Sequence, residues 1–246
     1  MDSEADQKSH ILNAQGVALD AVASWARYSR SEHLTGRQHS PLTDLLAGTL
    51  SQLAGQVEAV RMLVARELTF EADAIVRVMA EAAIILLWIG DDEERATRFC
   101  ADSATQYSAF IENLRANGVH ISEQLDTHVK QYRALFPGKN LPTTKDMARA
   151  RRVPPGYHRE LRPGERGPSE ILYDLAFKRC CLSAHPDLQT MLLIDEGRAA
   201  ANIHSYRDAL YASLWIIEVS SRVLRLPMNE VDPLTDVIHG ALTMGQ

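Results

Sequence analysis

The chain has 246 residues, of which 46% are hydrophobic, and its 26 lysine and arginine residues stand against 32 aspartate and glutamate residues, for a formal net charge of −6. A chain of this length and balance can bury a sizeable core. The composition excludes a disordered chain, a disulfide-stapled mini-protein and a globally basic nucleic-acid binder. No two cysteines have the CxxC spacing, so we expect free thiols in a reducing compartment at Cys100, Cys180 and Cys181.

No targeting or membrane segment is visible in the sequence. The first ten residues are polar and acidic, and they lack the basic start and apolar centre of a signal peptide. The longest apolar run, 82–89, is much shorter than the roughly 20 residues that a transmembrane helix needs. We therefore expect a cytoplasmic protein without a membrane partner.

The first half of the chain has the periodicity of amphipathic helices, with apolar residues at spacings of three and four. The segment 69–89 is the most apolar of all. Gly90 breaks it, and Asp91 or Asp92 can cap the helix that follows. The patterns of this half predict helices over residues 11–28, 42–66, 69–89, 92–116 and 122–136.

Residues 136–167 differ from the rest in composition. They contain five prolines, four glycines and eight lysine or arginine residues against three acidic residues, a local net charge of +5 that leaves −11 for the remainder of the chain. Because so many prolines are incompatible with a packed helix, we predict one long basic loop. Loops of this length are usually either functional or disordered. RNA or an acidic partner could contact this loop, although such charges are often simply solvated.

Helical periodicity resumes at 169–184, and Pro186 ends it. Residues 186–204 fit a strand, a helix or a loop. Ser205 is a good N-cap for a strong helix over 206–225, which Pro227 stops, and a last helix is expected over 233–242. The whole chain, residues 1–246, is thus predicted to be a single all-α domain, a bundle of seven or eight helices interrupted by the basic loop.

Arg77 and Glu81 are an unusual feature of the predicted helix 69–89. They lie four residues apart in an otherwise apolar stretch, and this spacing puts both side chains on one helix face. We expect the pair to be partly buried, and buried charges need partners. Two interpretations remain open: an ordinary ion pair within the helix, or part of a polar cluster in the bundle interior.

Arg179 and His185 form the second candidate group. RNA cleavage without a metal needs a group that moves a proton near neutral pH and a cation that holds the phosphate, and histidine and arginine suit these roles. The spacing alone discriminates poorly, because five of the nine histidines have an arginine at a comparable offset. Only His185 combines a helical flank with a following proline; the alternative is a histidine that caps or packs beside Pro186.

The segment from Arg77 to Arg98 resembles a pattern found in uncharacterised bacterial helical proteins, domains of unknown function related to the HEPN superfamily. These families show Arg-x-x-x-Glu, an apolar run that ends near a tryptophan, an acidic turn and a helix with arginines. Downstream they show a tyrosine-rich helix and a serine shortly before a histidine, here Ser183 and His185. The resemblance covers residues 70–190, and the sequence departs from it at Phe177, where tyrosine is usual, and at Cys181, where serine is usual.

The resemblance implies a HEPN-like protein that cleaves RNA without a metal, in stress response or phage defence, and that dimerises around its site. In that hypothesis Arg77 and Glu81 lie near His185, Arg179 holds the phosphate, His185 is the acid or base, and Glu81 orients His185 or holds Arg77. The second hypothesis is a non-catalytic interaction or ligand-binding bundle in which this cluster is structural. We expect no cofactor or metal, since the sequence has no Glu-x-x-His pairs, zinc spacing, phosphate loop or nucleophile elbow.

Overall fold

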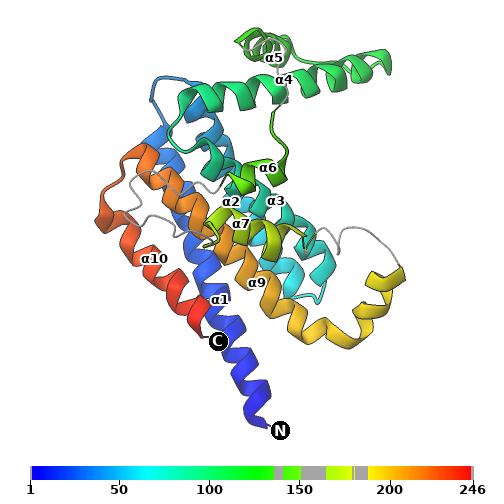
Figure 1. The fold of residues 1–246 in the computed structure, drawn as a ribbon, viewed down its shortest axis with the longest axis vertical. Helices are drawn as coiled ribbons and strands as arrows, with labels where there is room; N and C mark the ends of the chain where they lie inside the picture. Colours follow the sequence, from blue (N-terminus) through cyan, green and yellow to red (C-terminus); the bar gives the residue numbers. More distant parts are fainter. Residues whose placement is uncertain (1, 136–140, 151–164, 179, 181–187, 245–246) are drawn as a thin grey trace.

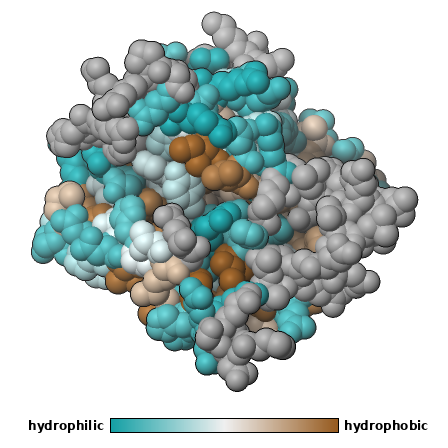
Figure 2. Space-filling view, turned by 60° about the horizontal axis from the view of Figure 1, so that its bottom comes forward, coloured by the Kyte–Doolittle hydropathy of each residue, from teal (hydrophilic) through white to brown (hydrophobic). Residues whose placement is uncertain are grey.

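The computed structural model describes residues 2–135, 141–150, 165–178, 180 and 188–244, and within these ranges the regular structure is helical, with no strand (Figure 1). The predicted all-α class is therefore confirmed. None of the helices in these ranges combines the length and apolar character that crossing a membrane requires. On the face shown in Figure 2, hydrophilic side chains surround small hydrophobic patches.

The body of the molecule is a bundle built on α3, which lies between α2 and α9, while α1 packs against α2, α9 and α10. Buried side chains of these helices form one connected core, with Leu50 of α2, Met79 and Ile84 of α3 and Ile216 of α9 fully enclosed. Each such side chain stabilises the fold by roughly 1.5–3 kcal/mol relative to an exposed position. The bundle helices are α1 (Asp2–Ser29), α2 (Pro41–Val64), α3 (Thr69–Ile89), α9 (Leu188–Leu224) and α10 (Met228–Thr243).

The ends of α2, α3 and α4 follow local sequence signals. Ser40 and Thr43 form a capping box at the start of α2, with Pro41 in the first turn. Gly90 ends α3 with φ 59° and ψ −125°, a conformation that favours glycine. The side chain of Asp92 then accepts a hydrogen bond from the backbone N–H of Arg95, 3.1 Å away, which confirms the predicted cap of α4.

Helices α4 (Glu93–Ala116) and α5 (Glu123–Leu135) form an arm that extends away from the bundle (Figure 1). The arm has its own small cluster of buried residues, Ala104, Ile111 and Val129. Asp126 of α5 ties the two helices together through Arg115, at 3.0 Å, and it also pairs with Lys130 at 2.7 Å. The hydrogen bonds from these two cations hold the pKa of Asp126 below its usual value.

The prediction of one uninterrupted loop over 136–167 is wrong, because α6 (Thr144–Arg149) lies within it. The hydroxyl of Thr143 caps this helix, and the side chain of Asp146 completes a capping box. Met147 and Ala148 are buried in the main core, and that burial holds so short a helix in place. The predicted loop also covers residues 136–140 and 151–164, which lie outside the described residues.

The predicted helix start at Ser205 is also wrong, because α9 runs without a break from Leu188 to Leu224. Ser205 lies inside α9, fully buried, and its hydroxyl donates a hydrogen bond of 2.6 Å to the equally buried Asp73 of α3. The serine therefore satisfies a buried carboxylate in a neighbouring helix instead of its own helix terminus. The ambiguous stretch 186–204 is helical from residue 188 onward.

Three further helices differ from their predicted limits. The first, α1, begins at Asp2 and leads into a π-helical turn, η1 (Arg30–Leu34). The predicted helix 169–184 begins as α7 (Pro168–Leu172) and continues through another π-helical turn, η2 (Tyr173–Phe177). The last, α10, begins five residues before Pro233 and passes through it, since buried residues such as Val231 and Leu234 anchor both sides of the proline.

Candidate functional site

Arg77 and Glu81 lie on one side of α3, and both are half-buried, as their apolar surroundings predict. The first of the two interpretations, an ion pair within the helix, is not what the structure has: in the described part of the chain, no ion pair or hydrogen bond joins the two side chains. Each is directed to a different neighbouring element. The single charged pair of the sequence is therefore two separate charged positions in the structure.

Arg77 lies against the turn η2. Its guanidinium carbon is 5.3 Å from the centroid of the Phe177 ring, a cation–π contact. Phe177 in turn stacks on Tyr173, with ring centroids 5.3 Å apart and an interplanar angle of 17°. The Nε atom of Arg77 is buried without a hydrogen-bond partner among the described residues. The Phe177 ring thus packs against the guanidinium, and no carboxylate of the described residues forms an ion pair with it.

Arg179 and His185, together with Cys181, Ser183 and Pro186, lie outside the described residues. The structure does place the end of the segment that leads to them, because Phe177 precedes Arg179 by two positions in the sequence. Arg77 and the turn before Arg179 are therefore in direct contact. Of the four predicted site residues, the described part of the chain places Arg77 and Glu81 on α3.

Glu81 is directed to α6. Its Oε1 atom accepts a hydrogen bond of 2.9 Å from the hydroxyl of Thr144. This hydrogen bond links the first turn of α6 to α3, against which α6 packs. Thr144 was missed by sequence reasoning, because it falls in the segment predicted as a loop. The signal that could have found it is the Thr143 to Asp146 spacing of a capping box.

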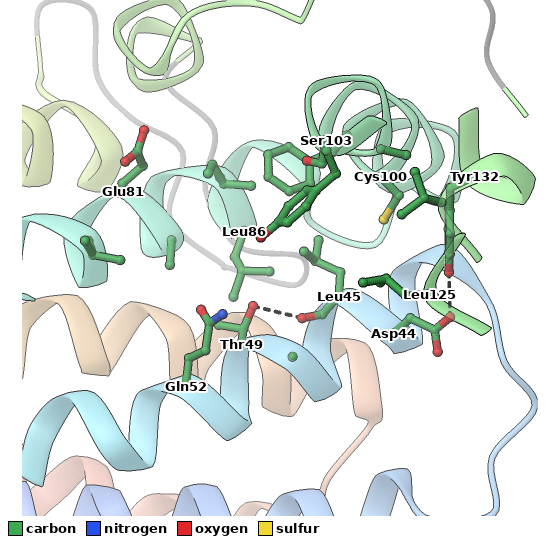
Figure 3. A pocket seen from close by; sticks show the side chains of 18 residues that line it. Asp44, Leu45, Thr49, Gln52, Glu81, Leu86, Cys100, Ser103, Leu125 and Tyr132 are labelled. Atoms are coloured by element: carbon green, nitrogen blue, oxygen red, sulfur yellow. Dashed lines mark hydrogen bonds between the residues drawn. The ribbon is translucent and has the colours of Figure 1, made fainter. Parts of the chain in front are cut away.

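A groove next to Glu81 was also missed. A cavity of about 630 Å³ opens between α2, α3, α4 and α5, and Glu81 and Asp44 lie at its opposite ends (Figure 3). A second cavity of about 380 Å³, on the α6 side, shares Glu81, Ile85 and Phe99 with the first. The described residues that line the larger cavity are mainly apolar, and none of them is a lysine, arginine or histidine. They include Leu45, Val78, Ala82, Ile85, Leu86, Phe99, Leu125 and Val129.

The end of the groove at Asp44 is closed by hydrogen bonds. The Tyr132 hydroxyl donates to Asp44 Oδ2 at 2.5 Å, and the other carboxylate oxygen of Asp44 is 2.8 Å from Nδ1 of His39 (Figure 3 shows the tyrosine contact). Burial and this hydrogen bond raise the pKa of Tyr132. Cys100 lies nearby, and burial, followed by the charges of Asp44 and Glu93, raises the pKa of its thiol to about 11. Both groups are therefore neutral at physiological pH.

Searched over the described residues, the structure has no group of three or more histidine, cysteine, aspartate or glutamate side chains placed to hold a metal ion. Among the described residues, Cys100 and Cys180 are not joined in a disulfide. The groups near α3 that can act chemically are therefore Arg77, which packs on Phe177 and has no ion-pair partner among the described residues, and Glu81, whose carboxylate lines an apolar groove.

The fold and these sites define an all-helical bundle with a projecting helical arm. The model of a family of unknown function (DUF5677) matches residues 43–199. This match spans more than half of the chain, so the chain belongs to that family, and the expectation of an uncharacterised family is confirmed. Neither the curated proteins nor the solved structures gave a match.

Proposed function

We propose that this protein is a HEPN-like, metal-independent endoribonuclease in which Arg77 and Arg179 hold a phosphate of RNA and His185 moves the proton. One observation carries the proposal: the guanidinium of Arg77, which has no ion-pair partner among the described residues, rests on Phe177 in the turn that leads to Arg179 and His185. Two candidate groups that are about a hundred residues apart in the sequence thus have neighbouring elements in the fold.

A half-buried arginine without a carboxylate partner is suited to hold a phosphodiester. Removing a cation from water has a cost, and an anion that reaches it recovers that cost through charge-assisted hydrogen bonds. The Phe177 ring packs against the guanidinium, and the Nε atom of Arg77 is buried. Because Arg77 is only half-buried, a ligand can still reach its charge.

The reaction would follow the chemistry of RNA itself. The 2′-oxygen attacks the adjacent phosphorus and forms a P–O2′ bond, while the P–O5′ bond breaks. The products are a 2′,3′-cyclic phosphate and a free 5′-hydroxyl. His185 would take the proton of the 2′-hydroxyl or supply one to the leaving 5′-oxygen, and the arginines would stabilise the charge that builds up on the phosphate oxygens.

Glu81 has no place in this proposed catalytic group. Its hydrogen-bond partner is Thr144, and among the described residues no hydrogen bond or ion pair joins Glu81 to Arg77. The basic segment does contribute: Lys145 and Arg149 are exposed on α6, which packs against α3, whereas Arg166 is paired with Asp174. We propose that Lys145 and Arg149 make further contacts with the RNA backbone.

The test is cleavage of a panel of single-stranded and structured RNAs in the presence of EDTA. We expect His185→Ala to lower the cleavage rate by about 10²–10⁴-fold, the usual contribution of a general acid or base. Arg77→Met should lower it by about 10²-fold, as expected for loss of one group that stabilises developing charge. Arg66→Met is the matched control, because Arg66 is exposed in the turn that follows α2, and it should cleave at the wild-type rate. Equal cleavage by wild type and His185→Ala, or no cleavage by any form, would overturn the proposal.

The alternative, a non-catalytic ligand-binding or interaction bundle, is favoured by one observation, the apolar groove beside Glu81. A folded wild-type protein that binds RNA weakly or not at all, and cleaves none of the panel, would support this alternative. Circular dichroism of each variant establishes that the comparison is made between folded proteins.

A further inference from the structure

We propose that the groove between α2, α3 and the α4–α5 arm binds a small apolar amine, whose ammonium group pairs with Glu81. This site is separate from the proposed RNA site, and the inference does not depend on the proposed function. It follows from three properties of the groove: its size, the chemistry of its walls and the state of its single available carboxylate.

The size of the groove is that of a small-molecule site. Its volume of about 630 Å³ falls within the roughly 300–1,000 Å³ that is usual for such pockets. The helices that bound it come from two parts of the fold, with α2 and α3 in the bundle and α4 and α5 in the arm. The walls are thereby held by both cores, while the mouth between them stays open.

The walls select an apolar ligand with aromatic or aliphatic character. Leu45 of α2, Ile85 of α3, Phe99 of α4 and Val129 of α5 face the cavity from four helices. Val78 and Tyr107, at the mouth, are 48% and 58% exposed, so apolar surface that is now in contact with water would be covered by a ligand. Covering such surface stabilises a complex by roughly 25 cal/mol per Å² before the cost of association is subtracted.

The charge of the lining selects a cation. Among the described residues, the carboxylates in the lining are those of Glu81 and Asp44, and no lysine, arginine or histidine accompanies them. Asp44 is already engaged by Tyr132 and His39. Glu81 uses one carboxylate oxygen for Thr144, and among the described residues its other oxygen has no hydrogen-bond partner. An ammonium group at this end would form a charge-assisted hydrogen bond in a partly dehydrated site.

The opposite ends of the groove therefore have different characters. At one end, Glu81 has a carboxylate oxygen that no described residue hydrogen-bonds, whereas at the other end the Asp44 carboxylate is hydrogen-bonded to Tyr132 and His39 (Figure 3). A ligand with an amine at one terminus and an apolar body at the other matches this polarity. A ligand with a carboxylate would meet Glu81 as a like charge and be rejected.

The experiment uses 4-phenylbutylamine and 4-phenylbutanoate, which differ only in the charged group, with titration calorimetry on the full chain. We expect saturable one-to-one binding of the amine and at least tenfold weaker binding of the carboxylate. Glu81→Gln should weaken amine binding about tenfold, since it removes the charge and keeps an acceptor for Thr144. Equal affinity for the two probes, or an unchanged affinity in Glu81→Gln, would overturn the proposal.

Filling the groove provides a second variant that does not touch charge. A side chain added at Gly48 of α2, which lines the groove, meets no atom within 4 Å of its Cβ, and the same is true of Gly55, which lies on α2 outside the groove. Both substitutions by leucine also raise helix propensity, so both proteins should fold. Gly48→Leu should abolish amine binding and Gly55→Leu should retain it. Amine binding that survives Gly48→Leu would contradict the site. The site would also be contradicted if the wild-type protein binds neither probe and forms a dimer that Gly48→Leu dissociates. A second copy of the chain would then occupy the groove.

Discussion

Arg77 and Glu81 lie one turn apart on the same face of α3, but their side chains have different partners. Arg77 lies on an aromatic stack in η2, and Glu81 accepts a hydrogen bond from Thr144 of α6 beside an apolar groove. The difference teaches that a spacing of four residues makes two charges neighbours on a helix face without making them a pair. The element that packs beside each residue determines its partner. The turn η2 packs beside Arg77, and α6 packs beside Glu81.

The buried side chains of α3 should therefore contribute most to the free energy of unfolding, whereas Arg77 and Glu81 should contribute most to ligand binding. The sharpest test removes a core side chain. Met79→Ala should lower the free energy of unfolding by about 2–5 kcal/mol, because it opens a cavity in a fully buried position of α3. Val78→Ala, at an adjacent and 48% exposed position, is the control and should stay within about 0.5 kcal/mol of wild type in urea denaturation. Similar losses in both variants would mean that α3 is not anchored as described.

A smaller effect is expected when Glu81 is truncated. Loss of one half-buried hydrogen bond from Thr144 should cost about 0.5–1.5 kcal/mol. A buried ion pair broken on one side would instead cost about 3–5 kcal/mol. The decisive quantity is the coupling free energy between Arg77→Ala and Glu81→Ala in a double-mutant cycle, which should lie within about 0.5 kcal/mol of zero. A coupling above that value would show that the two residues act as a pair in solution.

The smallest expected effect concerns the Cys100 thiol, which lines the apolar groove near Asp44. With its pKa raised to about 11 by burial and by Asp44 and Glu93, a fraction of only about 10⁻³ is thiolate at pH 8, so alkylation by iodoacetamide should be slow. The rate at Cys100, followed by peptide mass spectrometry, should rise about tenfold per pH unit up to about pH 11, because the thiolate is the reacting form. An alkylation rate that levels off near pH 8.5, as for an unperturbed thiol, would contradict the buried environment described for Cys100 at the groove.

The sequence predicted best where one helix supplies its own signals. The limits of α3 and the cap at Asp92 were both predicted correctly, since apolar spacing and a capping side chain are local properties. Ser205 shows why other predictions failed. Its sequence context is that of an N-cap, and only its contact with Asp73, which is 132 positions away, makes it an interior residue of α9.

The same limit applies to the candidate site. The sequence indicated Arg77 and Glu81 as unusual and predicted their partial burial, but their partners Phe177 and Thr144 lie 100 and 63 positions away and follow no local spacing. The groove was not predictable for the same reason, because its lining comes from four helices. Its charge selectivity depends on which residues these helices bring together, and composition does not report that.

The central claim is that Arg77 and Glu81 serve different ligands. The most direct measurement determines two affinities for each of the variants Arg77→Met and Glu81→Gln. The first is the affinity for a single-stranded oligoribonucleotide, measured in a His185→Ala background that prevents cleavage. The second is the affinity for 4-phenylbutylamine. We predict that Arg77→Met weakens RNA binding about tenfold and leaves amine affinity within twofold of the parent, and that Glu81→Gln does the reverse. If both variants weaken both ligands to the same extent, the two side chains belong to one site and the account is contradicted.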